Sequence, residues 1–422
     1  RAVSMIINGD SLEVLKTFED NSIDSVVTDP PYGLSFMGKK WDYDVPSTEL
    51  WTEVFRVLKP GGHLLAFAGT RTQHRMAVNI EDAGFEIRDM IAWVYGSGFP
   101  KSLNIGKAVD KIQGNKREVV GTQKLGGNAA QSTKEKGGTY ASNTNAVGVK
   151  PIDVTLTKGN SPWEGWGTAL KPALEPITVA RKPIKGSVAN NVLEHGVGGL
   201  NIDGCRVEAD SKELYRKPTE YKDISPSAGM NASKVRGSVT DDYLKGRFPA
   251  NFIHDGSDEV VELFPDTGGG KYKAPNARIR NNGLGLGTTD SRSGTSNAPD
   301  QYGDSGSAAR FFYCAKASKS ERNKGLEGLE VIRQGLAGEH KNTVSANIHP
   351  TVKPVKLMQY LVRLVTPKSG TVLDPFNGSG TTGIACKLES MEYIGIELDP
   401  EYCKISEARI EAWEADKQEK LI

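Results

Sequence analysis

The sequence predicts an α/β fold in which a mostly parallel, twisted sheet is covered by helices. Two stretches, residues 5–100 and the residues from about 346 onward, alternate short apolar runs with amphipathic ones. Such alternation is typical of parallel strands joined by helices. The long middle of the chain lacks this pattern. We therefore expect one α/β domain that is divided between the two ends of the sequence, with a different module inserted between its halves.

The first stretch contains three predicted strands and two predicted helices. The runs SIDSVVTD, HLLAFAG and FEIRDMIAWVY are short and apolar, as buried strands are. Between the first two, ELWTEVFRVLKPGG places Trp51, Val54, Phe55 and Leu58 on one face of a helix that should end at Gly61. RTQHRMAVNIEDAG predicts the second helix.

The last stretch continues the same pattern. Leu357, Tyr360, Leu361 and Leu364 have helical spacing, and the runs GTVLDPF and YIGIELD predict two more strands. TTGIACKLE and PEYCKISEARIEAW predict the helices that follow these strands. The middle differs, because residues 120–150 and 266–308 are rich in Gly, Asn, Ser and Thr and have almost no apolar periodicity, which predicts long loops.

The composition narrows the class of protein. Among 422 residues, 53 Lys and Arg nearly balance 52 Asp and Glu, so a nucleic-acid surface would have to come from local segregation of charge. The four cysteines are widely spaced, which fits a reducing compartment. Neither they nor the six histidines have the spacing of metal ligands, so we expect no metal site. No apolar run approaches 18 residues, so we expect no membrane span.

A glycine-rich loop at residues 372–383, VLDPFNGSGTTG, predicts a nucleoside site. Asp374 ends a strand, Gly378 and Gly380 permit a tight turn with close approach of a ligand, and the following helix offers unpaired N–H groups. The next strand ends in Glu397, 17 residues after Gly380, where an acid can accept both ribose hydroxyls. The spacing departs from the dinucleotide fingerprint, since the third glycine falls at Gly383, and a dinucleotide dehydrogenase would carry this unit near its N-terminus.

The second informative loop is TDPPYG, residues 28–33, at the end of the SIDSVVTD strand. Prolines end strands, but a simple strand end requires neither an acid nor an aromatic ring. Asp29 and the carbonyl of Pro30 can each accept a hydrogen bond from an amino group, and Tyr32 presents a flat face. Together they predict a clamp for the amino group of a planar heterocycle.

These two loops and their order resemble the β-class of DNA amino methyltransferases, which use S-adenosylmethionine (SAM). In that family a D-P-P-Y tetrapeptide comes first, a recognition region lies in the middle and a D-P-F-x-G-S-G loop comes last. INGDSLEVL (residues 7–15) and HPTVKP (residues 349–354) resemble two further cofactor-side segments of the family. The resemblance is specific over residues 5–104 and 346–410, loose over GWGTALKPALEPITVARKP and almost absent elsewhere. It implies a Rossmann-like, circularly permuted SAM-dependent methyltransferase fold with an inserted target-recognition domain.

The resemblance also assigns residues. It implies a catalytic loop of Asp29, Pro30, Pro31 and Tyr32. It implies cofactor binding by Asp10, Asp374, Pro375, Phe376, Asn377, Gly378, Ser379, Gly380, Thr381, Thr382, Glu397, His349, Thr351 and Lys353. It divides the chain into a catalytic half at 1–104, a basic and Gly-rich region that returns to the sheet at 105–184, a target-recognition domain at 185–345 and a SAM-binding half at 346–422.

The implied activity is site-specific transfer of a methyl group from SAM to N6 of a flipped-out adenine in double-stranded DNA. Asp29 favours adenine, since cytosine-N4 enzymes of the family more often carry Ser at that position. Cytosine-N4 methylation remains an alternative, as does a catalytically inactive protein that binds SAM and DNA; methylation of RNA or of a protein amide fits less well. No cysteine follows a proline, which argues against cytosine-C5 chemistry.

The segment 98–117 is the candidate for phosphate contacts because it carries five basic residues and one acid. The expected DNA-contacting side chains are Lys101, Lys107, Lys111, Lys116 and Arg117. A cytoplasmic, DNA-associated protein of prokaryotic or phage origin is expected, and the family adds the expectation of a homodimer. The recognised base sequence and any companion restriction enzyme stay open.

Overall fold

The computed structural model describes residues 3–34, 44–96, 98, 102–125, 152–208, 246–267, 306–315, 321, 324–326 and 352–413. Within these residues nine strands form one sheet, in the order β1-β13-β12-β2-β3-β7-β4-β8-β11. Their bounds are β1 Ser4–Asn8, β2 Ile23–Thr28, β3 Leu58–Phe67, β4 Glu86–Val94, β7 Leu174–Arg181, β8 Phe252–His254, β11 Tyr313–Cys314, β12 Thr371–Asp374 and β13 Glu392–Glu397.

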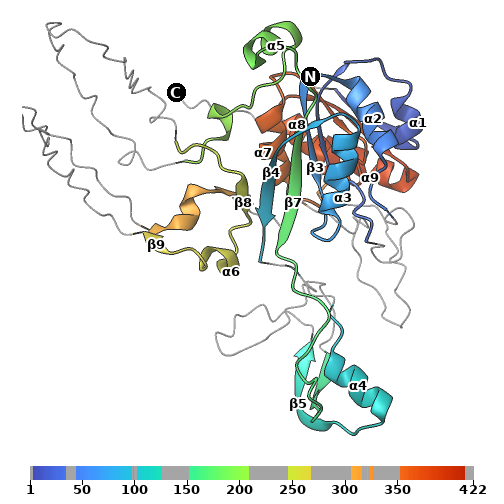
Figure 1. Ribbon diagram of the computed structural model, residues 1–422, viewed down its shortest axis with the longest axis vertical. Coiled ribbons are helices and arrows are strands. Elements are labelled where there is room, and N and C mark those ends of the chain that lie inside the picture. The colour runs from blue at the N-terminus through green and yellow to red at the C-terminus, as the bar shows by residue number, and fades with distance from the viewer. Residues whose placement is uncertain are drawn as a thin grey trace, which may run out of the picture.

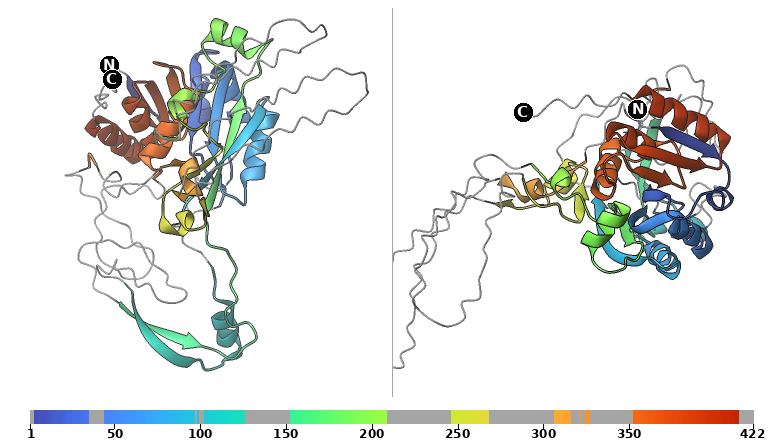
Figure 2. Two further views of the ribbon diagram at one scale, coloured as in Figure 1. Left: turned by 90° about the vertical axis from the view of Figure 1, so that its left-hand side faces the viewer. Right: turned by 90° about the horizontal axis from the view of Figure 1, so that it is seen from above.

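All neighbouring strands of this sheet pair in parallel except those next to β7, which runs antiparallel to both β3 and β4. The predicted α/β class with a mostly parallel sheet is therefore confirmed. Strands β12 and β13, from the end of the chain, lie between β1 and β2, from its beginning. Figures 1 and 2 show this joining of the two halves, with the last helices in red beside the first strands in blue.

Helices cover the sheet on both sides. One face packs against α1 (Ser11–Leu15), α2 (Thr48–Val57) and α3 (Gln73–Asp82), and the other against α7 (Val355–Val365), α8 (Thr381–Leu388) and α9 (Pro400–Ala412). Within β2 the neighbours Val26 and Val27 point into the two different cores, as the alternation of a strand requires. Both are fully buried, which explains why β2 is a continuous apolar run.

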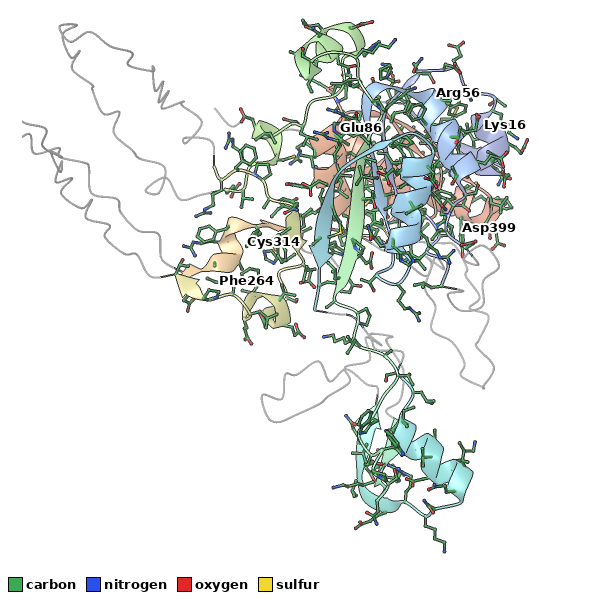
Figure 3. All side chains as sticks on the ribbon, in the orientation of Figure 1. Lys16, Arg56, Glu86, Phe264, Cys314 and Asp399 are labelled. Atoms are coloured by element: carbon green, nitrogen blue, oxygen red, sulfur yellow. The ribbon has the colours of Figure 1, made fainter. Side chains whose placement is uncertain are left out.

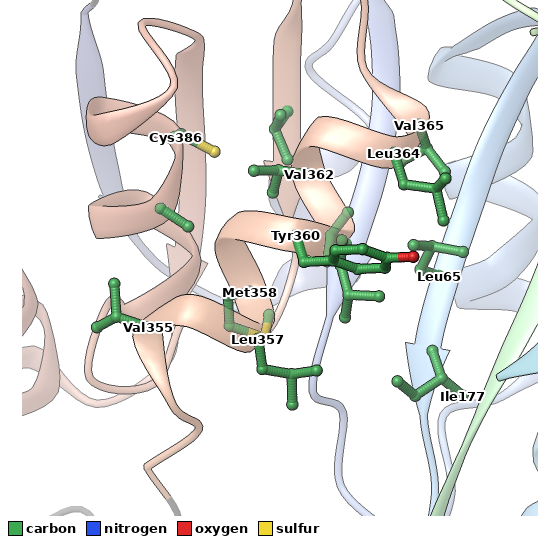
Figure 4. Packing of buried hydrophobic residues seen from close by; sticks show 14 of the residues in the cluster. Leu65, Ile177, Val355, Leu357, Met358, Tyr360, Val362, Leu364, Val365 and Cys386 are labelled. Carbon is green, nitrogen blue, oxygen red and sulfur yellow. The ribbon is translucent and has the colours of Figure 1, made fainter. Parts of the chain in front are cut away.

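Helix α7 shows how the second core is built. Leu357, Tyr360, Leu361 and Leu364 are buried as the helical spacing predicts, and Figure 4 shows the helix packed close to Leu65 of β3 and Ile177 of β7. Because all these side chains are removed from water, each contributes about 1.5–3 kcal/mol to folding.

One predicted boundary is wrong. Helix α2 ends at Val57 rather than at Gly61, and Leu58 is the first residue of β3 instead of a member of the helical face. The helix cannot continue because Pro60 has no backbone N–H to donate to a helical hydrogen bond. In addition, Gly61 adopts a positive φ of 82°. The strand therefore starts directly where the helix stops.

Two parts of the middle of the chain are described. The first, which we call the arm, comprises residues 102–125 and 152–172 and includes α4 (Ile105–Gln113), β5 (Glu118–Leu125) and β6 (Ile152–Lys158). It leaves the sheet after β4 and returns into β7, and Figure 1 shows α4 and β5 projecting from that end of the body.

The second part extends the sheet through β8 and β11. Phe252, Phe264 and Phe312 form an aromatic cluster there, with ring centroids 4.8–5.8 Å apart, and Figure 3 places Phe264 and Cys314 in this region. The remaining described elements are α5 Val188–His195, α6 Asp258–Val261, β9 Asp266–Thr267, β10 Gly306–Ser307 and short 3-10 turns at Asp203–Cys205 and Ala308–Phe311. Most of the predicted long loops lie outside the described residues.

Among the described residues, no helix combines the length and the apolar character needed to cross a bilayer. In the same part of the chain, His, Cys, Asp and Glu form no group of three suited to a metal ion.

Candidate active site

The two predicted loops meet at the centre of the sheet. Strands β12 and β2 are parallel neighbours, and the chain winds from β12 toward β13 on one side and from β2 toward β3 on the other. Ligands of open α/β sheets bind at such a switch point, outside the carboxyl ends of the strands. Here Thr28, the last residue of β2, donates a hydrogen bond of 2.6 Å from Oγ1 to Oδ1 of Asp374, the last residue of β12.

Both loops open into one cavity of about 1940 Å³. Its walls contain all four residues of the tetrapeptide, and on the other loop they contain Pro375, Phe376, Asn377, Gly378, Ser379, Thr381 and Thr382, together with Asp374, Asp10, Glu397 and Lys353. Residues that the sequence separates by more than 300 positions are therefore brought to one site, as the prediction required.

The tetrapeptide is part of a buried polar cluster. The hydroxyl of Tyr32 lies 2.7 Å from Oδ1 of Asp29 and 3.0 Å from Oε2 of Glu175, the second residue of β7. Nζ of Lys353 lies 2.7 Å from the same Glu175 oxygen, 3.1 Å from Oδ2 of Asp29 and 3.0 Å from the Tyr32 oxygen. Two carboxylates thus share one ammonium and one phenol.

Lys353 lines the cavity, and its ammonium contacts the tetrapeptide and Glu175. Its predicted role in cofactor binding stays a prediction. Its position just before α7, which packs against β2 and β3, aims the side chain at the end of β2. Glu175 was missed altogether. The signal in the sequence is weak, since it consists of one acid at the start of the apolar run EPITVARKP.

The charges of this cluster shift its pKa values. Burial raises the pKa of Asp29, while the Lys353 ammonium opposes that rise. For Glu175 burial acts in the same direction, but the attraction of Lys353 prevails and the pKa lies below its ordinary value. The charge of Glu175 adds to the rise in the pKa of Asp29, whereas hydrogen bonds from Lys353, Tyr32 and Tyr95 help to lower the pKa of Glu175. Burial lowers the pKa of Lys353, but the two carboxylates outweigh burial and raise it, so the lysine stays charged.

Asp374 organises the glycine-rich loop. Besides the Thr28 contact, its carboxylate accepts hydrogen bonds from the backbone N–H of Phe376 at 3.0 Å and from Oγ1 of Thr382 at 2.7 Å. The side chain is buried, and burial raises its pKa to about 6. The Asp374 carboxylate thus accepts hydrogen bonds from Thr28, from the backbone of Phe376 and from Thr382, and these contacts hold the loop in shape.

Close packing explains the glycines of this loop. Gly380 has a φ of 79°, and a Cβ on it would lie 2.7 Å from Cβ of Ser406, so no other residue fits without movement. A Cβ on Gly383 would lie 2.4 Å from the side chain of Ile410, so a glycine is needed where α8 packs against α9. Buried Arg409 of α9 supports the turn by donating to the carbonyl and the hydroxyl of Ser379.

Glu397 ends β13 on the same side of the cavity. Its Oε2 accepts from the N–H of Gly378 at 2.8 Å and its Oε1 from the N–H of Asp399 at 3.0 Å, so both oxygens are held in fixed positions. Burial raises the pKa of this carboxyl. Asp10 lines the cavity and caps helix α1, where it accepts from the N–H groups of Leu12 and Glu13. The predicted His349 and Thr351 lie outside the described residues.

The predicted phosphate-contacting side chains lie in the arm. Lys107, Lys111 and Lys116 are exposed, whereas Arg117 pairs with Asp110 and, at 2.7 Å, with Glu164 inside the arm. Lys101 lies outside the described residues. The segment that returns from the arm to β7, Thr168 to Leu174, lines the cavity, so the arm starts at the rim of the site.

Known proteins match this arrangement of loops. The family model for N6/N4 enzymes, described as DNA methylase, matches residues 23–408 of the chain, including both loops. This chain belongs to the DNA methylase family. The matched residues include strands from both ends of the chain and the middle that lies between them.

Two curated relatives match parts of the methylase. This chain is 24% identical over 245 residues to the type II methyltransferase M.HindIII of Haemophilus influenzae. The aligned region covers 47% of this chain and 65% of that enzyme. The chain is 43% identical over 104 residues to the type II methyltransferase M2.DpnII of Streptococcus pneumoniae. That aligned region covers 25% of this chain and 38% of that enzyme. The matched region thus spans less than two thirds of either relative.

Among solved structures, the crystal structure of the M1.HpyAVI–SAM complex is similar over 97% of this chain and 99% of that one, at 16% sequence identity. The TM-score of this match is 0.39.

Proposed function

We propose that the protein transfers a methyl group from SAM to the exocyclic N6 of an adenine flipped out of double-stranded DNA. The observation that carries the proposal is the single cavity of about 1940 Å³ that both loops share. Pockets for one small ligand usually measure about 300–1,000 Å³. The space therefore suits a nucleoside cofactor and a base side by side.

The glycine-rich side of the cavity fits the cofactor. Gly378 and Ser379 bring backbone to the wall of the cavity, and Glu397 presents a carboxylate with fixed oxygens that can accept ribose hydroxyls. Asp10 is placed to contact the adenine end. When bound, SAM supplies an electrophilic methyl group on sulfur.

The tetrapeptide side fits the base. An amine inside a duplex is inaccessible, so the base must leave the stack and be held by stacking and by its edge. Asp29 and the Pro30 carbonyl would accept the two hydrogens of the amine, and the ring of Tyr32 would stack on the base. Lys353 stabilises the ionised form of Asp29, which is the form that can accept. Catalysis then rests on positioning and electrostatics.

Adenine is the proposed base, on the grounds of Asp29 at the first position of the tetrapeptide and of the larger face that a purine offers to Tyr32.

The proposed path of the DNA runs along the arm, whose Lys107, Lys111 and Lys116 would contact phosphates. Because the curated relatives are bacterial enzymes, the proposal includes a bacterial or phage origin and a cytoplasmic, DNA-associated location, and it also includes a homodimer.

The test is transfer of labelled methyl from SAM to unmethylated plasmid DNA by the purified protein. We expect label in the DNA with the wild-type protein and none with Asp29→Ala, which should still bind SAM. Label in RNA or protein instead of DNA would refute the proposal, as would equal transfer by the two proteins. Recovery of the label only as N4-methylcytosine would replace adenine by cytosine.

A further inference from the structure

Glu175 stands out among the residues of the cavity because no motif accounts for it. Strand β7 is antiparallel to β3, so its first residues lie at the edge of the sheet where β2 and β3 end. This brings Glu175 beside the tetrapeptide, although 143 residues separate it from Tyr32. Its second oxygen, Oε1, accepts a hydrogen bond of 3.2 Å from the hydroxyl of Tyr95. The carboxylate is thus held at both oxygens.

Each oxygen of Asp29 already has one donor within the site. Its Oδ1 is within hydrogen-bonding distance of the Tyr32 hydroxyl, and its Oδ2 contacts the Lys353 ammonium. An amine on the target base would have to share the Asp29 oxygens with these two donors. Glu175 offers both donors another acceptor, at 3.0 Å for Tyr32 and 2.7 Å for Lys353.

The phenol can serve only one of the two carboxylates at a time. A tyrosine hydroxyl has a single proton to donate, and Tyr32 Oη also accepts from Lys353 at 3.0 Å. When Tyr32 donates to Glu175, Oδ1 of Asp29 is released. Lys353 is already closer to Glu175 than to Asp29, so its ion pair with Asp29 is the longer of the two.

We infer that Glu175 is a positioning residue, which takes the Tyr32 hydroxyl and the Lys353 ammonium from Asp29 so that Asp29 can accept the target amine. The inference rests on the proposed methyl transfer and adds to it a residue that acts through Tyr32 and Lys353. Glu175 also fixes the edge of the Tyr32 ring, which must lie flat against the base.

The charge on Glu175 gives the inference a signature in the pH profile. The charged and titratable groups around Asp29 are Lys353, Glu175, Tyr32 and, across β12, Asp374. In Glu175→Gln the like charge disappears and Lys353 turns wholly to Asp29. The pKa of Asp29 should then fall, so the acid limb of the rate profile should move to lower pH even though the maximal rate decreases.

The experiment measures single-turnover methyl transfer from the preformed protein–SAM–DNA complex between pH 5.5 and 9. For Glu175→Gln we expect a rate about 10- to 100-fold below wild type at pH 8, the loss expected for a disturbed charged hydrogen bond. The acid limb should move down in pH, and the dissociation constant of SAM by calorimetry should be unchanged. Glu175→Asp, which keeps the charge, should recover part of the rate.

Two further variants make the result decisive. Lys353→Met removes the cation from Asp29 and should move the acid limb in the opposite direction, to higher pH. Glu86→Gln removes an ion-paired carboxylate from the far end of the β4–β7 pair and should leave the limb in place. Near-wild-type rates for Glu175→Gln, an unmoved limb, or a parallel loss of SAM binding would overturn the inference. If the wild type itself transfers no methyl to DNA, the proposed function fails instead.

Discussion

The hydroxyl of Thr28 lies 2.6 Å from Oδ1 of Asp374, and this hydrogen bond joins the last residue of β2 to the last residue of β12. The contact is buried, and the two residues are 346 positions apart in the chain. It links the loop of the tetrapeptide to the glycine-rich loop. We therefore expect a change at one end of this bond to alter the other end as well.

Thr28→Val tests that link. Valine keeps the shape of threonine but removes the donor, which leaves a buried carboxylate short of one hydrogen bond at a cost of about 1.5–3 kcal/mol. The free energy of unfolding and the affinity for SAM should both decrease. The control is Ser25→Ala, on the same strand as Thr28, which removes a buried hydroxyl that pairs with Thr366 at the end of α7. It should reduce stability without a change in SAM affinity, and equal SAM affinities for both variants would contradict the link.

Asp374 should make stability depend on pH. Burial raises its pKa from 3.8 to about 6, so the folded protein binds its proton more tightly than the unfolded chain does. The contribution of Asp374 to stability is therefore greatest below pH 4 and declines as the pH rises to about 6. Asp374→Asn carries no such charge. The free energy of unfolding of Asp374→Asn minus that of wild type should therefore decrease by at most about 3 kcal/mol when the pH is lowered from 7 to 4.

Denaturant unfolding of both proteins without cofactor at pH 4, 5, 6 and 7 measures this difference, and the other titrating groups cancel in it. A difference that is the same at each pH would show that Asp374 does not titrate in this range.

The fold and both loops were predictable because their signals are local. A strand followed by D-P-P-Y and a strand followed by a glycine-rich turn can be read from neighbouring residues, and the parallel sheet then brings Asp29 and Asp374 to one edge. Glu175 could not be predicted, because its approach depends on one antiparallel strand in the sheet. The end of α2 was misjudged for a related reason: Leu58 suits a helical face equally well, and only the sheet pairing of Ile23 with Leu58 assigns it to β3.

Tyr32 should tolerate only flat replacements. Base–aromatic stacking is worth about 1–3 kcal/mol, so Tyr32→Ala should lose much of the activity. Tyr32→Trp should keep some activity because the stacking surface persists. Rates of labelled methyl transfer under saturating SAM compare the variants, and similar rates for Trp and Ala at position 32 would exclude a stacking role.

The lysines of the arm should set the salt dependence of DNA binding. Removal of one lysine that binds a phosphate should reduce the slope of log K against log salt by about 0.9. We expect Lys107→Ala, Lys111→Ala and Lys116→Ala to weaken DNA binding whatever its sequence, with SAM affinity unaffected. Lys16→Ala, at an exposed lysine that follows α1 and pairs with Glu13, is the control. Fluorescence anisotropy at several salt concentrations measures the slopes, and slopes equal to that of the control would remove the arm from the DNA interface.

The most direct test of the central claim is nucleoside mass spectrometry of DNA from a bacterial strain that lacks its own DNA methylases. The strain expresses either the wild-type protein or Asp29→Ala, at matched protein levels. We predict N6-methyladenine in the DNA of the first culture and none in that of the second. A new N4-methylcytosine peak without N6-methyladenine, or N6-methyladenine at the same level in both cultures, would contradict the account.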